Sequence, residues 1–400
     1  MKYPQYILKR KIEDVLLYPF ILLGRIIASL KPLSKEYETF FFFPFYHTGG
    51  AEKVHALVTQ ATGNTSCIVY FTRKSYDKNF YRDFVQSGCT IKDISRFTDN
   101  KWVYFLNFIY RGIISGYIDH QKQRPIIFNG QCNFGYKISP WINPSIPQIE
   151  LLHSFNTFSW IRIPFIPFIT RTVMISRLRI EDHLKQYKKL GIPNQYNERI
   201  QYIVNGIPLP ASIQPKDFNA SIKVLYVGRA TEEKRVHLIA QMAEKAFQNN
   251  LPVEFIFMGD VREAISLGLV KYCKLTGHKS DPAEIDHIYQ QAHIVIITSS
   301  TEGFPMVIEE GMVRGCIVMA TPVGDIPLHV KHKENGFLFT TFANEQLIVK
   351  EAIDYLTLIC DRKQLLAQMG DRNIEYARQH FSIEAFNRQY QQLFKQLRNQ

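Results

Sequence analysis

Two glutamates with seven residues between them, Glu302 and Glu310, carry the clearest chemical signal in this sequence. They lie in the stretch 298–315, which follows the apolar run 293–297. That run is short, rich in β-branched residues and without helical period, so it predicts a buried parallel strand. A helix is expected to begin near Pro305, because proline needs no N–H donor in a first turn. Glu302 is then expected in the loop, and Glu310 about two turns into the helix.

The predicted position of both carboxylates favours ligand binding. In open α/β sheets, ligands bind outside the carboxyl ends of the strands. The first N–H groups of a helix attract anions and hydroxyl groups. A carboxylate accepts several hydrogen bonds, so each glutamate can hold the diol of a ribose or pyranose ring. The alternative interpretation is an ordinary strand–loop–helix unit with two surface carboxylates.

Composition sets broad limits on the class of protein. A chain of 400 residues suggests two or three domains, and 46 % hydrophobic with 21 % charged residues is ordinary for a soluble globular protein. The six cysteines include no CxxC pair, which favours buried thiols in a reducing cytoplasm over disulfides or a zinc site. The net charge of +12 fits anionic lipid or phosphorylated ligands, since no nucleic-acid-binding signature is found.

Residues 1–35 form a basic segment ahead of the first predicted core strand. They contain seven Lys or Arg and two Asp or Glu. The apolar run 15–24 is too short for a bilayer, which needs about twenty residues, and it lacks the cleavage site of a signal peptide. Two interpretations remain open: a basic amphipathic segment on the cytoplasmic membrane face, or a helix packed on the first domain.

Short apolar strands alternate with helical segments along most of the chain, which predicts parallel, doubly wound sheets. A proline-containing polar stretch, 209–221, has the character of an interdomain linker. The expected domains are the N-terminal segment 1–35, a first Rossmann-like domain 36–207 that also takes up 383–400, and a second Rossmann-like domain 208–382.

Two further loops have residue types suited to phosphate. The first places Gly49 and Gly50 between a strand and a helix, and glycine lets backbone approach a ligand closely. The second places Arg229 and Lys234 around a strand–helix loop, where they can contact phosphate oxygens. Solvated surface charges are the alternative for these two cations. His153, at the end of another strand, is a candidate for either a structural or a catalytic role.

These motifs, taken in order, resemble those of the retaining glycosyltransferases with a GT-B fold, known as family 4 or glycosyl transferases group 1. The resemblance covers nearly the whole chain after residue 37 and rests on Gly49-Gly50, Asn205-Gly206, Gly228-Arg229 with Lys234, and the E-x7-E pair Glu302 and Glu310. It implies two doubly wound Rossmann-like domains facing across a cleft, with the C-terminal helix crossing back to the first. The chain departs from the family pattern at Arg235 and Asp325, where glycine is usual.

The resemblance also implies roles for individual residues. Glu310 would bind the ribose diol, Arg229 and Lys234 the diphosphate, Glu302 the sugar hydroxyls, and His153 the donor sugar. Catalytic roles are expected for Glu302, His153, Arg229 and Lys234. The rest of the donor site would comprise Gly49, Gly50, Gly228, His278, Gly303, Phe304, Pro305, Met306, Val307 and Glu310.

The implied reaction moves a sugar from a nucleotide-diphosphate sugar to a glycan or lipid-linked acceptor in cell-surface polysaccharide biosynthesis. Fixed cations would stabilise the leaving diphosphate, so we expect no metal and no other cofactor, and the Asp-x-Asp metal motif is absent. The expected partners are the nucleotide sugar, the acceptor and the inner face of the cytoplasmic membrane, with no nucleic acid. The protein would be cytoplasmic and peripheral to that membrane.

Other functions remain as alternatives. A nicotinamide oxidoreductase is disfavoured because no Gly-x-Gly-x-x-Gly follows a strand. An epimerase or phosphorylase with the GT-B fold would share the architecture. A catalytically silent, membrane-associated scaffold that binds nucleotide sugars would share the pocket without turnover.

Overall fold

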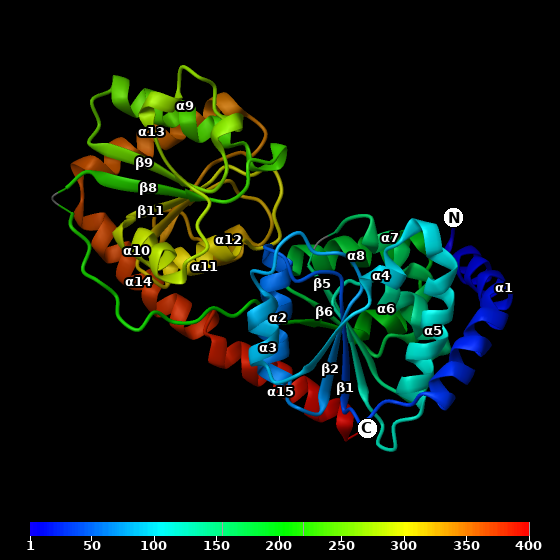
Figure 1. The fold of residues 1–400 in the computed structure, drawn as a ribbon. Coiled ribbons are helices and arrows are strands. Elements are labelled where there is room, and N and C mark those ends of the chain that lie inside the picture. Colours follow the sequence, from blue (N-terminus) through cyan, green and yellow to red (C-terminus); the bar gives the residue numbers. More distant parts are fainter. Residues whose placement is uncertain (154, 219, 400) are drawn as a thin grey trace. The chain divides into compact units, whose positions relative to one another are not determined.

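The computed structural model describes residues 1–153, 155–218 and 220–399 (Figure 1). Contacts divide the chain into two compact units. The N-terminal unit comprises Met1–Gly206 together with the residues from Phe386 on, and the C-terminal unit comprises Ile207–Ala385. Each unit is built on its own parallel sheet.

The sheet of the N-terminal unit has seven parallel strands in the order β3-β2-β1-β4-β5-β6-β7. Its central strands are buried throughout, as expected for strands covered on both faces. The edge strands β3 and β7 were not predicted, because they are short, partly exposed and lack an apolar run. The strands are β1 Thr39–Phe43, β2 Cys67–Phe71, β3 Thr90–Asp93, β4 Ile126–Asn129, β5 Gln148–Leu152, β6 Arg171–Met174 and β7 Ile200–Tyr202.

Helices cover this sheet, and local signals explain several of their ends. In α8, the Ser176 side chain caps the first turn, and Gly191 ends the helix in the left-handed region at φ 75°. The helices are α1 Tyr3–Leu30, α2 Gly50–Thr62, α3 Tyr81–Gln86, α4 Ser95–Thr98, α5 Tyr104–Asp119, α6 Asn133–Ile138, α7 Phe158–Ile161 and α8 Arg177–Leu190.

The last helix of the chain, α15 (Ile383–Arg398), packs on the N-terminal sheet for most of its length. The Phe394 ring lies 6.2 Å from that of Phe41 and 6.1 Å from that of Phe128, centroid to centroid. Gln391 also donates a hydrogen bond to the Ala61 carbonyl at 3.0 Å. The return of the C-terminal helix to the first domain is therefore confirmed.

The C-terminal unit has six parallel strands in the order β10-β9-β8-β11-β12-β13. Together, the two parallel sheets confirm the predicted α/β class with two Rossmann-like units. The strands are β8 Ile222–Val227, β9 Val253–Met258, β10 Cys273–Gly277, β11 Ile294–Ile297, β12 Ile317–Ala320 and β13 Gly336–Leu338. The helices are α9 Val236–Gln248, α10 Pro282–Gln291, α11 Met306–Met312, α12 Ile326–His329, α13 Glu345–Asp361 and α14 Gln364–His380.

Residues 3–30 form one continuous helix, α1, which runs beside α5 (Figure 1). Two glycines let the helices meet backbone to backbone. A Cβ atom on Gly24 would lie 2.2 Å from the Ile109 carbonyl oxygen, and one on Gly112 would lie 2.2 Å from the Ile21 carbonyl oxygen. One face of this segment therefore packs on the domain, and no helix among the described residues is long and apolar enough to cross a membrane.

Candidate active site

Two loops of the C-terminal unit bring a cation and a carboxylate into contact. Lys234 lies between β8 and α9, and Glu302 lies between the neighbouring strand β11 and α11. The Lys234 Nζ atom lies 2.6 Å from Glu302 Oε1, and the Ser299 hydroxyl donates to the same oxygen at 2.6 Å. The Lys234 and Glu302 side chains remain 23 % and 10 % exposed, so a ligand can reach the pair.

Arg235 holds these two loops together, although sequence reasoning treated it only as a departure from the family pattern. Its Nε donates to the Thr298 carbonyl at 2.7 Å and its Nη2 to the Ser299 carbonyl at 3.1 Å. The residue adopts the left-handed conformation that glycine prefers, with φ 49°. This conformation costs a non-glycine residue about 1–2 kcal/mol, an amount that charge-assisted hydrogen bonds of about 1.5–3 kcal/mol each can offset.

Glycines allow close backbone packing at the same edge of the sheet. Gly324 has φ 61°, and a Cβ atom there would lie 2.0 Å from the Gly303 carbonyl oxygen. A Cβ atom on Gly259 would lie 2.0 Å from the Gly228 carbonyl oxygen. The predicted site residues Gly228 and Gly303 therefore lie in loops against which a neighbouring loop packs too closely for any side chain.

Glu310 is the fifth residue of α11, so it lies just over one turn into the helix rather than the predicted two turns. The Tyr289 hydroxyl donates a hydrogen bond to its Oε2 atom at 2.7 Å. Burial of Tyr289 and then the Glu310 charge raise the pKa of this tyrosine well above its usual value, so Tyr289 stays a donor. The Glu310 carboxylate is therefore held in a fixed orientation and is half-buried.

In the segment 303–307, the main chain is better placed than the side chains to contact a ligand. The Phe304 side chain is buried, with its ring centroid 4.3 Å from that of His329. It therefore belongs to the core, and only its main chain can contact a ligand. Pro305 precedes α11 as the N-cap, and Met306 and Val307 are half-buried in its first turn.

The remaining predicted residues of this unit, Arg229 and His278, are exposed and follow β8 and β10. The Arg229 carbonyl accepts a hydrogen bond from the Tyr226 hydroxyl at 2.7 Å, which fixes the backbone of the β8–α9 loop. The structure thus brings Lys234 and Glu302 together and places Arg229 on the loop that carries Lys234, whereas His278 follows β10.

In the N-terminal unit, the predicted glycine loop joins β1 to α2. Gly50 is the first residue of α2, and Gly49 is the N-cap in an extended conformation. The Thr48 N–H donates to Asp77 Oδ1 at 3.2 Å. A Cβ atom on Gly49 would lie 2.1 Å from Glu52 Oε2, so the glycine makes room for this acidic side chain.

His153 follows β5 and contacts a second histidine that the sequence analysis did not identify. Its Nε2 atom lies 2.9 Å from Nε2 of His55, a buried residue of α2. Burial lowers the pKa of His153 to about 4. The pKa of His55 is lowered well below its usual value, mainly by burial and to a smaller extent by the neighbouring His153. Both rings are therefore neutral at pH 7, with one donating and the other accepting. The apolar residues around His55 predict that it is buried. No sequence pattern predicts its contact with His153.

A buried ion pair joins β5, the strand that precedes His153, to Arg162, which follows α7. The Glu150 carboxylate of β5 pairs with Arg162, and it also accepts hydrogen bonds from Tyr136 at 2.8 Å and Thr172 at 2.7 Å. Burial alone would raise the pKa of Glu150, but the Arg162 charge and these hydrogen bonds outweigh it and lower the pKa. A charge inside an apolar strand requires a partner, so Glu150 is the residue from which this network could have been predicted.

The backbone near His153 adopts an uncommon conformation. Gln131, in the loop between β4 and α6, has φ 57°, and its side chain is buried. A Cβ atom on the adjacent Gly130 would lie 2.6 Å from His55 Nε2, so no larger residue fits there. Non-glycine residues in the left-handed region cluster at functional sites, and this one lies beside the histidine pair.

Two parallel Rossmann-like units agree with the GT-B architecture predicted from the sequence. Residues 212–379, which make up most of the C-terminal unit, match the family model for glycosyl transferases group 1. The C-terminal unit therefore matches the glycosyl transferases group 1 over most of its length, in agreement with the group 1 resemblance predicted from the sequence.

Individual proteins agree with this assignment. The chain is 27 % identical over 205 residues to a D-inositol 3-phosphate glycosyltransferase of Corynebacterium efficiens, covering 48 % of this chain and 44 % of that protein. It is 27 % identical over 198 residues to the amylovoran biosynthesis glycosyltransferase AmsK of Erwinia amylovora, covering 41 % of this chain and 48 % of that protein. The alignments thus span under half the length of these curated relatives.

A solved structure resembles the chain over more of its length. HepE of Anabaena, in complex with UDP-glucose, has a TM-score of 0.70 and 18 % identity, covering 90 % of this chain and 99 % of that one. At this identity the likeness establishes the fold.

Proposed function

We propose that this protein is a retaining glycosyltransferase that moves a sugar from a nucleotide-diphosphate sugar to a glycan or lipid-linked acceptor in cell-surface polysaccharide biosynthesis. The relatives supply the substrate class: HepE was solved with UDP-glucose, and AmsK is named for amylovoran biosynthesis. The observation that carries the proposal is the contact between Lys234 and Glu302 at the ends of adjacent strands.

The proposed role of the cations follows from where charge develops. When the bond between sugar and diphosphate breaks, the diphosphate gains negative charge, and a fixed cation stabilises that charge without reorganising. Lys234 is positioned by its 2.6 Å contact with Glu302, and Arg229 lies on the same β8–α9 loop. Lys234 and Arg229 are therefore assigned to the leaving diphosphate.

The carboxylates receive the hydroxyl-binding roles. Glu310, oriented by the Tyr289 hydroxyl, is assigned to the ribose diol. Glu302, whose Oε1 atom contacts both Lys234 and Ser299, is assigned to the sugar hydroxyls. This arrangement would let Glu302 hold Lys234 in place before the donor binds.

His153 is assigned to the donor sugar as a neutral group. Its lowered pKa and its contact with His55 favour a ring that forms hydrogen bonds and carries no charge at pH 7. A neutral imidazole can donate or accept a hydrogen bond at a sugar hydroxyl without competing for the diphosphate.

The proposal is tested by incubating the purified full-length protein with a panel of UDP-, GDP- and ADP-sugars and measuring nucleotide release. At least one donor is expected to release nucleotide, and Lys234→Met is expected to lower the rate of release by about 10²–10³-fold. Lys245→Met, at an exposed position of α9, is the matched control. Release is also expected to survive EDTA. A strict requirement for added magnesium or manganese would mean that a metal carries the diphosphate.

Two outcomes would favour the alternatives. A sugar nucleotide that raises the melting temperature without any release, with or without glycan acceptors, would indicate a silent scaffold. Conversion of the donor to an epimer would indicate an epimerase. Thermal shift is sensitive enough to detect such binding, because a ligand at a hundred times its Kd stabilises the fold by about 2.7 kcal/mol.

A further inference from the structure

The helix α1 carries apolar residues on its solvent-facing side as well as on its packed side. At about 3.6 residues per turn, the exposed apolar positions along its 28 residues fall on one side of the helix, as expected for one stripe. Each side chain of the stripe is between 45 % and 76 % exposed. We define the outer face as Leu8, Ile12, Val15, Leu16, Leu22, Leu23, Ile26 and Leu30.

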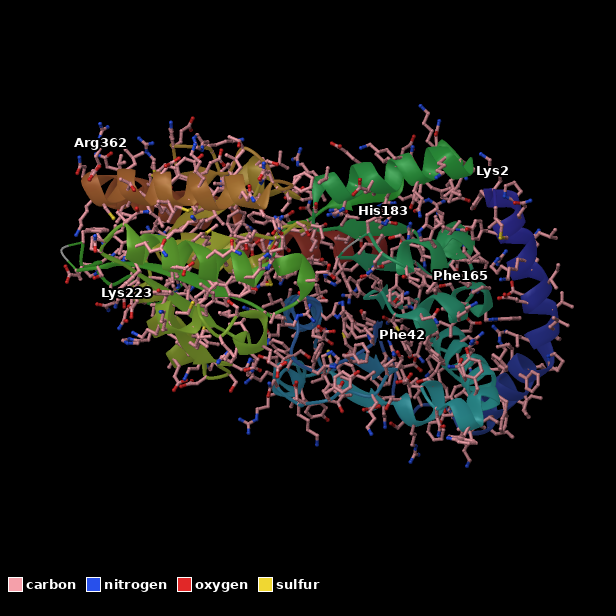
Figure 2. The ribbon with its side chains drawn as sticks, turned by 90° about the horizontal axis from the view of Figure 1, so that it is seen from above. Lys2, Phe42, Phe165, His183, Lys223 and Arg362 are labelled. Carbon is pink, nitrogen blue, oxygen red and sulfur yellow. The ribbon has the colours of Figure 1, made fainter. Side chains whose placement is uncertain are left out.

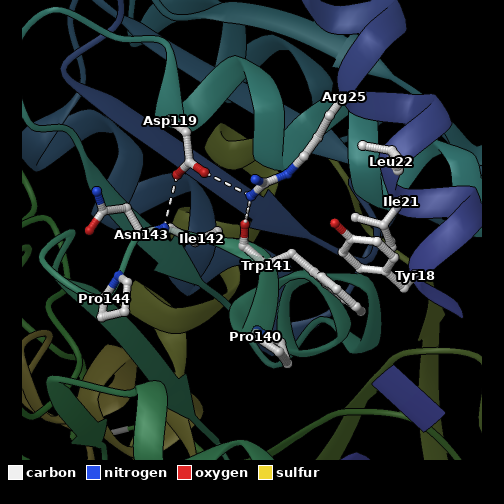
Figure 3. A pocket seen from close by; sticks show the side chains of 10 residues that line it. All are labelled: Tyr18, Ile21, Leu22, Arg25, Asp119, Pro140, Trp141, Ile142, Asn143 and Pro144. Carbon is white, nitrogen blue, oxygen red and sulfur yellow. Dashed lines mark hydrogen bonds and ion pairs between the residues drawn. The ribbon is translucent and has the colours of Figure 1, made fainter. Parts of the chain in front are cut away.

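The opposite side fixes α1 to the N-terminal unit, so the stripe cannot turn inward. Ile21, Gly24 and Ala28 are buried in that packing. Figure 3 shows the Arg25 guanidinium reaching across a pocket of about 480 Å³ to Asp119, at 2.8 Å, and to the Trp141 carbonyl. The outer face is thus presented on a rigid support, and Figure 2 shows α1 at an edge of its unit with side chains projecting into solvent.

Charges on α1 are segregated between its two sides. Both acidic residues have cationic partners: Glu13 pairs with Lys137 at 3.2 Å, and Asp14 with Arg10 at 3.3 Å. Three exposed lysines are next in sequence to outer-face residues: Lys9 and Lys11 in α1, and Lys31 just after its end. An apolar stripe bordered by cations is complementary to a surface that is apolar inside and negative at its boundary.

Aromatic residues extend this surface onto α5. The Phe20 ring of α1 lies 5.8 Å from that of Phe108, which in turn lies 5.4 Å from that of Tyr104. Tyr104 and Phe105 are about half exposed, and Trp102, just before α5, is 94 % exposed. Tryptophan and tyrosine are the residues enriched at the boundary between water and lipid.

We propose that the outer face of α1 docks on an anionic lipid bilayer, lying in the interface without crossing it. Contiguous exposed apolar patches of this length are rare on monomeric soluble proteins and mark interaction sites. A second copy of the chain is the less favourable occupant, because pairing two such faces would bring their bordering lysines together. The proposal does not depend on glycosyl transfer, since it concerns residues outside the candidate active site.

The test is flotation of the full-length protein with vesicles of phosphatidylcholine alone or with about 30 % phosphatidylglycerol, an order-of-magnitude choice for an anionic surface. The outer-face variant is Val15→Asp with Ile26→Asp, at two exposed positions that leave the packing on α5 intact. The matched control is Phe247→Asp with Leu267→Asp, two exposed apolar residues of the C-terminal unit. A third variant replaces Lys9, Lys11 and Lys31 with glutamine.

The unaltered protein is expected to bind the anionic vesicles at least about tenfold better than the neutral ones. The outer-face variant should lose at least about tenfold in binding to anionic vesicles, the lysine variant should lose the preference for them, and the control should bind normally. Equal binding by the protein and the outer-face variant, or binding by neither, would overturn the proposal. So would a dimer in solution that the outer-face variant dissociates, because the occupant would then be a second copy.

Nucleotide release without vesicles separates this proposal from the proposed function. The outer-face variant is expected to keep the release rate of the unaltered protein. A protein that binds vesicles but releases no nucleotide would contradict the proposed function and leave the membrane surface supported.

Discussion

Each unit of the molecule contains a glutamate–cation pair on its parallel sheet, and the two pairs differ in burial. Glu150 and Arg162 in the N-terminal unit are both 0 % exposed. Glu302 and Lys234 in the C-terminal unit are 10 % and 23 % exposed. The buried pair is surrounded by protein hydrogen bonds from Tyr136 and Thr172, whereas the other pair lies at strand ends where a ligand can reach it.

This difference predicts opposite consequences for stability and activity. Breaking a buried pair leaves an uncompensated charge, which costs about 3–5 kcal/mol. Breaking a pair that water can reach, such as Lys234 and Glu302, should cost less, because water can take the place of the lost partner. We therefore expect the N-terminal pair to maintain the fold and the C-terminal pair to act on the substrate.

The largest expected effect is that of Arg162→Met on the N-terminal unit. It should lower the free energy of unfolding by about 3–5 kcal/mol, because Glu150 would be left charged in the core. All three tryptophans of the chain, Trp102, Trp141 and Trp160, lie in this unit. Urea unfolding followed by tryptophan fluorescence therefore reports on it. A loss below about 1 kcal/mol would mean that the pair is dispensable.

Lys234→Met should show the reverse behaviour. Turnover should fall by about 10²–10³-fold, because one fixed charge is lost where negative charge develops. Stability should change by less than in Arg162→Met, because water can reach this partly exposed pair. Steady-state nucleotide release beside thermal unfolding measures both quantities. Equal losses of activity in Lys234→Met and the control Lys245→Met would remove Lys234 from the site.

Glu310→Gln should affect donor binding more than turnover. Glutamine keeps the size of the side chain but loses the charge that accepts two hydroxyl hydrogen bonds, so KM for the donor should rise about tenfold. Tyr289→Phe should cause a smaller rise, because the carboxylate remains but is less well oriented. Glu334→Gln, at an exposed position, is the control. An unchanged KM in Glu310→Gln would exclude it from ribose binding.

The sequence predicted the fold well because buried parallel strands are continuous apolar runs, as in β1 and β11. It missed β3 and β7, whose short and partly exposed edges have no such pattern. Spacing located Glu302, Lys234 and their loops, but it did not show that the two residues touch, because that contact depends on β8 and β11 being neighbours.

The roles of some residues could not be predicted from the sequence, because they depend on the backbone conformation or on long-range contacts. Arg235 was identified as a departure from the family pattern, yet nothing in the sequence shows that it adopts the conformation of the glycine it replaces. His55 and His153 are 98 positions apart and meet only because α2 and the end of β5 are adjacent in space. Long-range contacts of this kind require the three-dimensional arrangement of the strands.

A comparison of Arg235→Gly with Arg235→Ala tests whether the left-handed conformation of residue 235 costs stability. Both variants lose the hydrogen bonds to Thr298 and Ser299, but glycine also removes the strain of the left-handed conformation. Arg235→Gly should therefore be more stable than Arg235→Ala by about 1 kcal/mol. Thermal unfolding followed by circular dichroism would measure the difference. Equal stabilities would mean that this position stores no backbone strain.

A pH-dependent effect concerns the paired histidines of the N-terminal unit, His55 and His153, which contrast with the charged pair Lys234 and Glu302 of the C-terminal unit. The folded-state pKa of His153 is lowered to about 4, whereas an unfolded histidine titrates near about 6.5. As the pH falls from about 6.5 towards 4, the unfolded chain therefore takes up a proton that folded His153 does not, and stability decreases.

Replacing His153 with glutamine, which keeps a hydrogen-bonding group near His55, should reduce this pH dependence by up to about one proton per molecule. Urea unfolding by tryptophan fluorescence between pH 4.5 and 7.5 measures the slope, and His120→Gln, at an exposed position, serves as the control. Identical slopes in the protein and His153→Gln would show that this ring titrates normally, and the neutral role assigned to it would then be wrong.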